Sequence, residues 1–176
     1  MLIYFLILMG AVLRILPHPA NFAPIAALAL FGAVYVKDKR LALILPLSAM
    51  IVSDVFLGFD NWQSRLSVYG TFFLVGLIGL WIRNHKNVFT VVGGTLIGST
   101  LFYLITNLVW IYPPKMYPHT LDGQITSYIN ALPFFKYTLL GDLFYVGLFF
   151  GLYELIWLYE SKYKPMRPAI ASKKLD

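Results

Sequence analysis

Long apolar runs separated by short polar stretches make up most of the chain. A helix needs roughly 17–25 apolar residues to cross the hydrocarbon core of a bilayer. Six runs approach or reach that length: residues 2–16, 22–36, 41–59, 66–82, 88–112 and 138–159. The first two are short and are divided by Pro17-His18-Pro19, where the missing amide hydrogens of proline stop a continuous helix. The pattern predicts an all-α, polytopic membrane bundle of six transmembrane helices.

Composition strengthens the membrane interpretation. Hydrophobic residues make up 59% of the 176 residues and charged residues only 12%, against about 25% charged residues in a typical soluble domain. We expect residues 1–160 to form one membrane domain and residues 161–176 a basic cytoplasmic tail. The sequence contains no cysteine, which excludes disulfides and thiolate metal sites. Because the basic residues flank apolar runs, the net charge of +6 favours contact with anionic lipid headgroups and not with nucleic acid.

The distribution of basic residues predicts the orientation. Cytoplasmic connections of membrane proteins are enriched in Lys and Arg. With six spans, ten of the 14 basic residues fall on the side that carries both termini, and four fall on the other side. The tryptophans agree, since Trp62 and Trp110 fall at the predicted outer interface and Trp81 and Trp157 at the inner one. We therefore expect an N-in/C-in topology.

The connection at residues 113–137 is the longest one. It contains Ile125, Tyr128, Ile129 and Leu132 at helical spacing. This spacing predicts a short amphipathic helix on the outer surface, before the sixth span. Such a helix is either a lid over a cavity or an interfacial filler.

Four polar residues within the predicted spans lie at similar depths in the outer third of the membrane: Arg14, Asp54, Asn107 and Asp142. An ionisable group in a span is costly and usually faces the bundle interior. One interpretation is a pocket open to the outside, in which Arg14 contacts a carboxylate or phosphate and the aspartates accept hydrogen bonds. The alternative is a structural bridge in which Arg14 pairs with one aspartate.

The predicted substrate-binding residues lie in this layer or just above it: Arg14, His18, Asn21, Asp54, Asn107, Trp110, Asp142 and Tyr145. His18 and His119, together with Asp60 or Asp122, lack the ligand spacing of a metal site, so neither a metal nor another cofactor is expected. The sequence has no phosphate-binding loop, nucleophile elbow or His-Glu-x-x-His motif, so we do not expect an enzyme.

Small residues four positions apart allow helix backbones to approach closely. They occur on the second, fifth and sixth predicted helices, and most such pairs serve internal packing. The second helix has two pairs and is the best candidate for a face that docks another membrane protein, through Ala23, Ala27, Ala29 and Ala33.

Two stretches carry a family resemblance. The first runs from Arg14 through Pro17-His18-Pro19 and Asn21 to Asp54, and the second comprises Ala131-Leu-Pro133-Phe-Phe followed by Thr138-Leu-Leu-Gly141-Asp142. Together they resemble a family of six-helix bacterial membrane proteins, which is in turn similar to the substrate-binding S components of energy-coupling factor (ECF) vitamin transporters. The likeness extends to about Tyr159.

This resemblance implies a protein of the bacterial inner membrane that captures a vitamin or micronutrient near the outer face. S components associate with a transmembrane coupling subunit and two cytoplasmic ATPases, and they dock the coupling subunit through an alanine ladder on the first helix. In this chain the ladder lies on the second predicted helix.

We therefore expect an S component of an ECF-type uptake transporter that binds a small polar ligand. The alternatives are a non-catalytic scaffold subunit, which predicts a solid core, and a small intramembrane enzyme acting on lipids. The enzyme would require His18 or His119 to contact a nucleophile.

Overall fold

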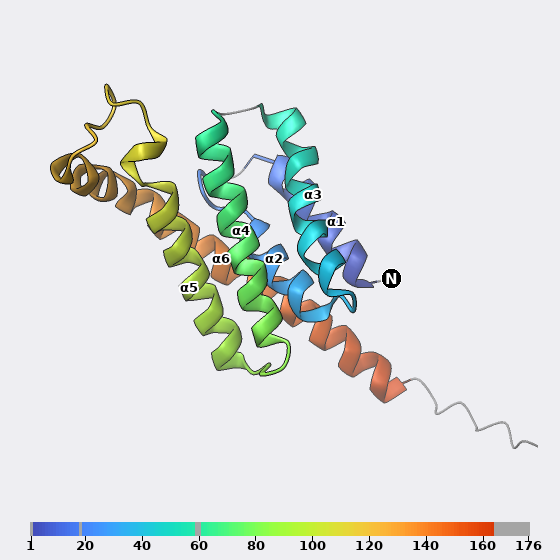
Figure 1. Ribbon diagram of the computed structural model, residues 1–176. Coiled ribbons are helices and arrows are strands. Elements are labelled where there is room, and N and C mark those ends of the chain that lie inside the picture. Colours follow the sequence, from blue (N-terminus) through green and yellow to red (C-terminus); the bar gives the residue numbers. More distant parts are fainter. Residues whose placement is uncertain (1, 18, 59–60, 164–176) are drawn as a thin grey trace, which may run out of the picture.

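The computed structural model describes residues 2–17, 19–58 and 61–163, and within these residues the protein is all-α (Figure 1). The six α-helices and one 3₁₀ helix are α1 (Leu2–Ile15), α2 (Ile25–Tyr35), α3 (Lys39–Leu57), α4 (Trp62–Ile82), α5 (Val88–Thr106), η1 (Val109–Ile111) and α6 (Leu121–Tyr163). The all-α prediction is confirmed.

Four helices, α3 to α6, are long and apolar enough to cross a membrane. Their outward surfaces carry large apolar side chains, such as Phe56, Leu66 and Phe89, which are 71%, 64% and 88% exposed. Such apolar surface is unfavourable in water and matches a lipid environment. The helices α1 and α2 have 14 and 11 residues, about 21 Å and 17 Å at the usual rise, so each is shorter than the roughly 30 Å hydrocarbon core.

The short helix α2 forms the centre of the bundle. Every residue from Ile25 to Val34 is buried, and α2 contacts each of the other five α-helices. A helix that is apolar on all sides is stable only when other elements surround it. A Cβ atom on Gly79 of α4 would lie 2.6 Å from the Ala33 Cβ, so the absence of a side chain there lets α4 approach α2 closely.

This position corrects the docking prediction for α2. Ala27, Ala29 and Ala33 are at most 2% exposed, and Ala23 precedes the helix at the edge of a cavity. Ala27, Ala29 and Ala33 pack inside the bundle and present no outward face, because the other helices cover α2.

Asparagine and aspartate side chains cap the N-termini of three of the long helices. Asp38 accepts backbone N–H bonds at the start of α3, and Asn61 does so at the start of α4. Asn87 and Thr90 form a reciprocal capping box at the start of α5. These local hydrogen bonds satisfy amide groups that lack partners within the helix, so they define where each helix begins.

The connections after α2 and α4 lie at the same end of the bundle, here called the basic end. Arg83 donates hydrogen bonds to the carbonyls of Ala33, Val36 and Lys37, and so caps the end of α2. Lys86 forms an ion pair with Glu154 of α6, with Nζ 2.5 Å from Oε1. The connections after α1, α3 and α5 lie at the opposite end, here called the cavity end (Figure 1).

The helix α6 differs from its prediction. It has 43 residues and continues through Pro133, so the predicted outer helix is the first part of α6 and not a separate element. In Figure 1 this helix crosses the bundle obliquely, and its first part lies near the end of α5. Tyr103 of α5 donates a hydrogen bond to the Tyr128 carbonyl, and Tyr128 donates to the Leu104 carbonyl. These contacts tie the first part of α6 to α5.

The fifth span also ends earlier than predicted, because α5 stops at Thr106 and η1 follows it. The carbonyl of Asn107 accepts hydrogen bonds from the side chains of Gln124 and Ser127 on α6. The backbone therefore finds its partners outside the helix at this point. Most of the predicted cytoplasmic tail, residues 164–176, lies outside the described residues.

Candidate functional site

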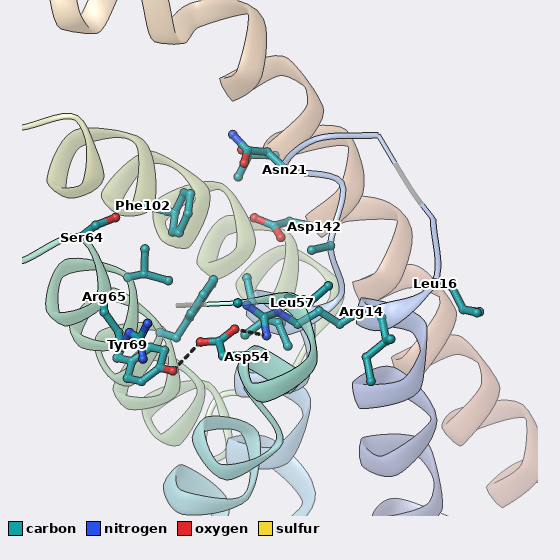
Figure 2. Close-up of a pocket in the computed structure, with 18 of the residues that line it drawn as sticks. Arg14, Leu16, Asn21, Asp54, Leu57, Ser64, Arg65, Tyr69, Phe102 and Asp142 are labelled. Carbon is teal, nitrogen blue, oxygen red and sulfur yellow. Dashed lines mark hydrogen bonds and ion pairs between the residues drawn. The ribbon is translucent and has the colours of Figure 1, made fainter. Parts of the chain in front are cut away.

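A cavity of about 500 Å³ lies at the cavity end, and residues from all six α-helices line it (Figure 2). Its apolar lining includes Phe72 of α4 and Phe102 of α5, whose rings stack with centroids 5.3 Å apart. Its polar side chains come from α1, the α1–α2 connection, α3, α4 and α6: Arg14, Asn21, Asp54, Ser64, Arg65, Tyr69, Thr138 and Asp142. Arg14, Asp54 and Asp142, three of the four polar residues that the sequence places in one layer, line this cavity together.

Arg14 and Asp54 form an ion pair on one side of the cavity. Arg14 Nη1 lies 2.5 Å from Asp54 Oδ1, and the two side chains are only 16% and 12% exposed. The same nitrogen donates hydrogen bonds to the Met50 carbonyl, at 3.1 Å, and to the Ser53 hydroxyl. The Tyr69 hydroxyl donates to Asp54 Oδ2 at 2.5 Å. Both oxygens of Asp54 are therefore occupied, and the network joins α1, α3 and α4.

Asp142 lies on another side of the cavity and has different surroundings. It is 3% exposed, and the Ser99 hydroxyl of α5 donates a hydrogen bond to its Oδ2 at 2.6 Å. Among the described residues, no basic side chain lies within ion-pair distance of Asp142. Figure 2 shows its carboxyl pointing from α6 toward the interior of the cavity.

The connection between α1 and α2 forms part of the cavity wall. Asn21 has a φ of 63°, in the left-handed region that asparagine tolerates better than most residues. The Phe22 amide donates to the Pro19 carbonyl at 3.0 Å and closes this turn. A Cβ atom on Gly141 would lie 3.0 Å from Phe22 Cα. The glycine beside Asp142 therefore lets the turn pack directly on α6, which places Asn21 next to the cavity.

A second cavity of about 280 Å³ adjoins the first. The two share lining residues, among them Asn21, Phe102 and Thr138. The remaining lining of the second cavity comes from α5, the α5–α6 connection and the first part of α6, and it is rich in aromatic rings: Tyr103, Tyr112, Tyr117, Phe134 and Phe135. Asn107 lines this second cavity and not the first, so the predicted layer of four polar groups is divided between the two cavities.

Two predicted residues line neither cavity. Tyr145 is 7% exposed and packs against Phe22, with ring centroids 5.6 Å apart. Trp110 is 68% exposed and contacts the His119 ring at a centroid distance of 4.7 Å. His18 lies outside the described residues.

Several cavity residues did not enter the sequence prediction. Arg65 and Tyr69 lie four positions apart on α4, and this spacing places both on one helix face. Ser99 of α5 donates a hydrogen bond to Asp142 of α6. A Cβ on the preceding Gly98 would lie 3.1 Å from a Val75 methyl group, so α4 and α5 also pack closely here. The four-residue spacing of Arg65 and Tyr69 is a signal in the sequence that could have identified this pair. The Ser99 contact depends on packing between distant segments.

The described residues contain no group of three His, Asp or Glu side chains placed to hold a metal ion. His119 Nε2 lies 3.0 Å from the Tyr112 carbonyl, away from the aspartates of the first cavity. His18 and Asp60 of the sequence-based metal candidates lie outside the described residues.

A family model described as a family of unknown function, DUF6580, matches residues 1–168. The chain belongs to this family. The matched range contains every residue that lines either cavity. No curated protein and no solved structure matches the chain.

Proposed function

We propose that this protein is a membrane-embedded binding protein that captures a small polar ligand at the external face of the bacterial inner membrane. In this proposal it is the substrate-binding component of an ECF-type micronutrient or vitamin transporter. The observation that carries the proposal is the cavity lined by all six helices, which contains charged side chains within an otherwise apolar bundle.

The size and lining of this cavity suit a ligand. Small-molecule sites typically enclose about 300–1,000 Å³ and combine an apolar wall with a few polar groups. Here the stacked rings of Phe72 and Phe102 supply apolar wall, and Asn21, Arg65 and Asp142 supply polar groups. Polar residues within membrane spans are costly and usually functional.

The direction of capture rests on the charge distribution. The basic end carries Lys37, Lys39, Arg40, Arg83 and Lys86, and cytoplasmic connections are the ones enriched in such residues. In that orientation the cavity end faces the outside. The sequence contains no nucleotide-binding loop, so the energy for transport comes from partner ATPases. Because α2 is buried, another surface docks the coupling subunit.

The rival functions receive less support. A scaffold subunit requires only a packed core, whereas two adjoining cavities interrupt the core at the cavity end. A lipid-modifying enzyme requires a base in contact with a nucleophile. His119 contacts the Tyr112 carbonyl and the Trp110 ring instead.

Co-purification from native membranes tests the proposal. The affinity-tagged full-length protein is extracted in mild detergent, and the accompanying polypeptides are identified by mass spectrometry. A tagged, unrelated polytopic protein at the same expression level is the control. We expect a coupling subunit and two ATPases to accompany the protein specifically. Recovery of the protein alone indicates a solitary carrier, and recovery of envelope-assembly proteins indicates a scaffold.

Cysteine labelling tests the orientation, because the natural chain contains no cysteine. Lys115→Cys lies at the cavity end and Lys39→Cys at the basic end, and both positions are exposed. In intact cells, a membrane-impermeant maleimide is expected to label Lys115→Cys and not Lys39→Cys. The reverse pattern would place the cavity on the cytoplasmic side and refute capture from outside.

A further inference from the structure

The electrostatics of the two cavities indicate which chemical class of ligand the protein takes. This inference rests on the proposed function and deepens it. The positive charge of Arg14 is balanced within the protein by Asp54, at 2.5 Å. An anionic ligand would therefore compete with an existing ion pair at Arg14, and breaking a buried pair leaves an uncompensated charge.

Asp142 presents the opposite situation. Its carboxyl group is buried and lines the cavity, and its partner in the structure is the neutral Ser99 hydroxyl. A carboxylate offers about four acceptor positions. The single Ser99 proton fills one of them at most, and Ser99 Oγ also lies 3.0 Å from the Thr95 carbonyl. A buried carboxylate is costly unless donors or a cation compensate it. The Asp142 carboxylate can therefore accept further hydrogen bonds from a ligand, and a positively charged N–H donor makes the strongest bond of this kind.

The aromatic lining continues from Asp142 into the second cavity. Thr138 lies one turn before Asp142 on α6, and Phe102 lies one turn after Ser99 on α5; both line the two cavities. Beyond them, Tyr103 and Phe135 pack with ring centroids 4.7 Å apart. A flat ring attached to a nitrogen group at Asp142 would extend along this lining, where aromatic faces stabilise both rings and cations.

We propose that the ligand is an aromatic or heteroaromatic molecule bearing an amine or amidine, with its nitrogen donors on Asp142 and its ring between Phe102 and the second cavity. Asp54 and Arg14 line another part of the cavity and remain paired when the ligand binds. The ligand therefore belongs to the nitrogen bases, and its nitrogen donors on Asp142 are its principal anchor.

Matched small probes test this class without knowledge of the natural ligand. The purified full-length protein in lipid nanodiscs is titrated with benzamidine, benzyl alcohol and benzoate, which share one ring and differ in charge. Saturation-transfer NMR measures binding, and empty nanodiscs give the background. We expect benzamidine to bind best and benzoate worst. Equal or stronger binding of benzoate, or no binding of benzamidine above background, would overturn the proposal.

A variant identifies the anchoring residue. Asp142→Asn keeps the side-chain size and is expected to weaken benzamidine binding by about tenfold or more, as for loss of a charged hydrogen bond. Asp122→Asn changes an exposed aspartate on the same helix, away from both cavities, and is the matched control. Unchanged binding in Asp142→Asn would refute the assignment. The order in which the three probes bind to the unaltered protein tests the ligand class even if Asp142→Asn does not fold.

Acetamidine, which has the same nitrogen group without a ring, tests the aromatic part. We expect it to bind more weakly than benzamidine, and equal binding would refute the ring position. These outcomes are independent of the partner test. Co-purifying ATPases without any preference for benzamidine would refute the ligand class and leave the transporter proposal standing. A benzamidine preference without such partners would refute the transporter proposal and leave the ligand class standing.

Discussion

Asp54 and Asp142 lie at the same end of the bundle, and each interrupts a long apolar helix, yet their surroundings differ. Asp54 has Arg14 on one oxygen and Tyr69 on the other. Asp142 is more deeply buried and has the Ser99 hydroxyl. The first arrangement links three helices through compensated charge. The second arrangement leaves acceptor positions of the Asp142 carboxylate directed into a cavity.

This difference separates two roles that burial alone does not distinguish. A buried charge is tolerated when a partner compensates it, either within the protein or in a ligand. The structural bridge considered from the sequence describes Arg14 and Asp54 well, whereas the binding interpretation applies best to Asp142. Substitutions in the Arg14–Asp54 pair should therefore reduce stability, whereas substitution of Asp142 should reduce ligand binding with little effect on stability.

Arg14→Met is expected to give the largest loss of stability. It leaves Asp54 buried without its cation, and breaking a buried pair in this way costs about 3–5 kcal/mol. The free energy of unfolding is measured by SDS titration in mixed micelles. The double variant Arg14→Met/Asp54→Leu removes both charges and is expected to recover much of the loss. If Arg14→Met is as stable as the natural protein, the pair is not a structural link.

Tyr69→Phe tests the second partner of Asp54. The change removes one hydroxyl that donates to Oδ2, and we expect a loss of about 1.5–3 kcal/mol, as for hydrogen bonds to charged groups. Tyr4→Phe alters a tyrosine that is 50% exposed on α1 and is the control, expected to leave the unfolding midpoint unchanged. Equal stability of the two variants would show that Arg14 alone supports Asp54.

Gly141→Ala tests how the Asp142 side of the cavity is built. The new methyl group would press on Phe22 Cα at 3.0 Å, and such overpacking typically costs about 1–3 kcal/mol. Because the 19–22 turn must shift, we also expect weaker benzamidine binding. Gly147→Ala on the same helix meets no atom within 4 Å and should be neutral or slightly stabilising. A Gly141→Ala variant with unchanged stability and binding would show that the turn adapts freely.

Asp142→Asn should have the smallest effect on stability. It removes a buried carboxylate that has no basic partner among the described residues and keeps an oxygen for Ser99, so we expect a change within about 1 kcal/mol. The matched Asp54→Asn variant is expected to unfold much more readily, since Arg14 then loses its partner charge. If both variants lose the same stability, the two aspartates share a structural role and the contrast fails.

The sequence by itself determined the all-α architecture and the position of three charged residues at one end of the bundle. Apolar runs longer than about 17 residues are typical of membrane helices. The capping residues Asp38, Asn61 and Asn87, which the sequence prediction did not use, also act locally, through hydrogen bonds to nearby amides. The position of Arg14, Asp54 and Asp142 at one end of the bundle follows from helix rise and the alternating direction of the helices. All of these features depend on residues close together in the chain or on regular geometry.

The tertiary structure alone decided which faces meet. The spacing of the alanines in α2 is compatible with an outward docking face as well as with internal packing, and only the surrounding helices show that they lie in the centre. The helix α6 continues through Pro133, and hydrogen bonds from Tyr103 to the Tyr128 carbonyl and from Tyr128 to the Leu104 carbonyl tie its first part to α5. Likewise, Arg14 was equally close in depth to both aspartates. Its pairing with Asp54 follows from the packing of α1 against α3, a contact between segments about 40 residues apart, for which no local sequence pattern provides a signal.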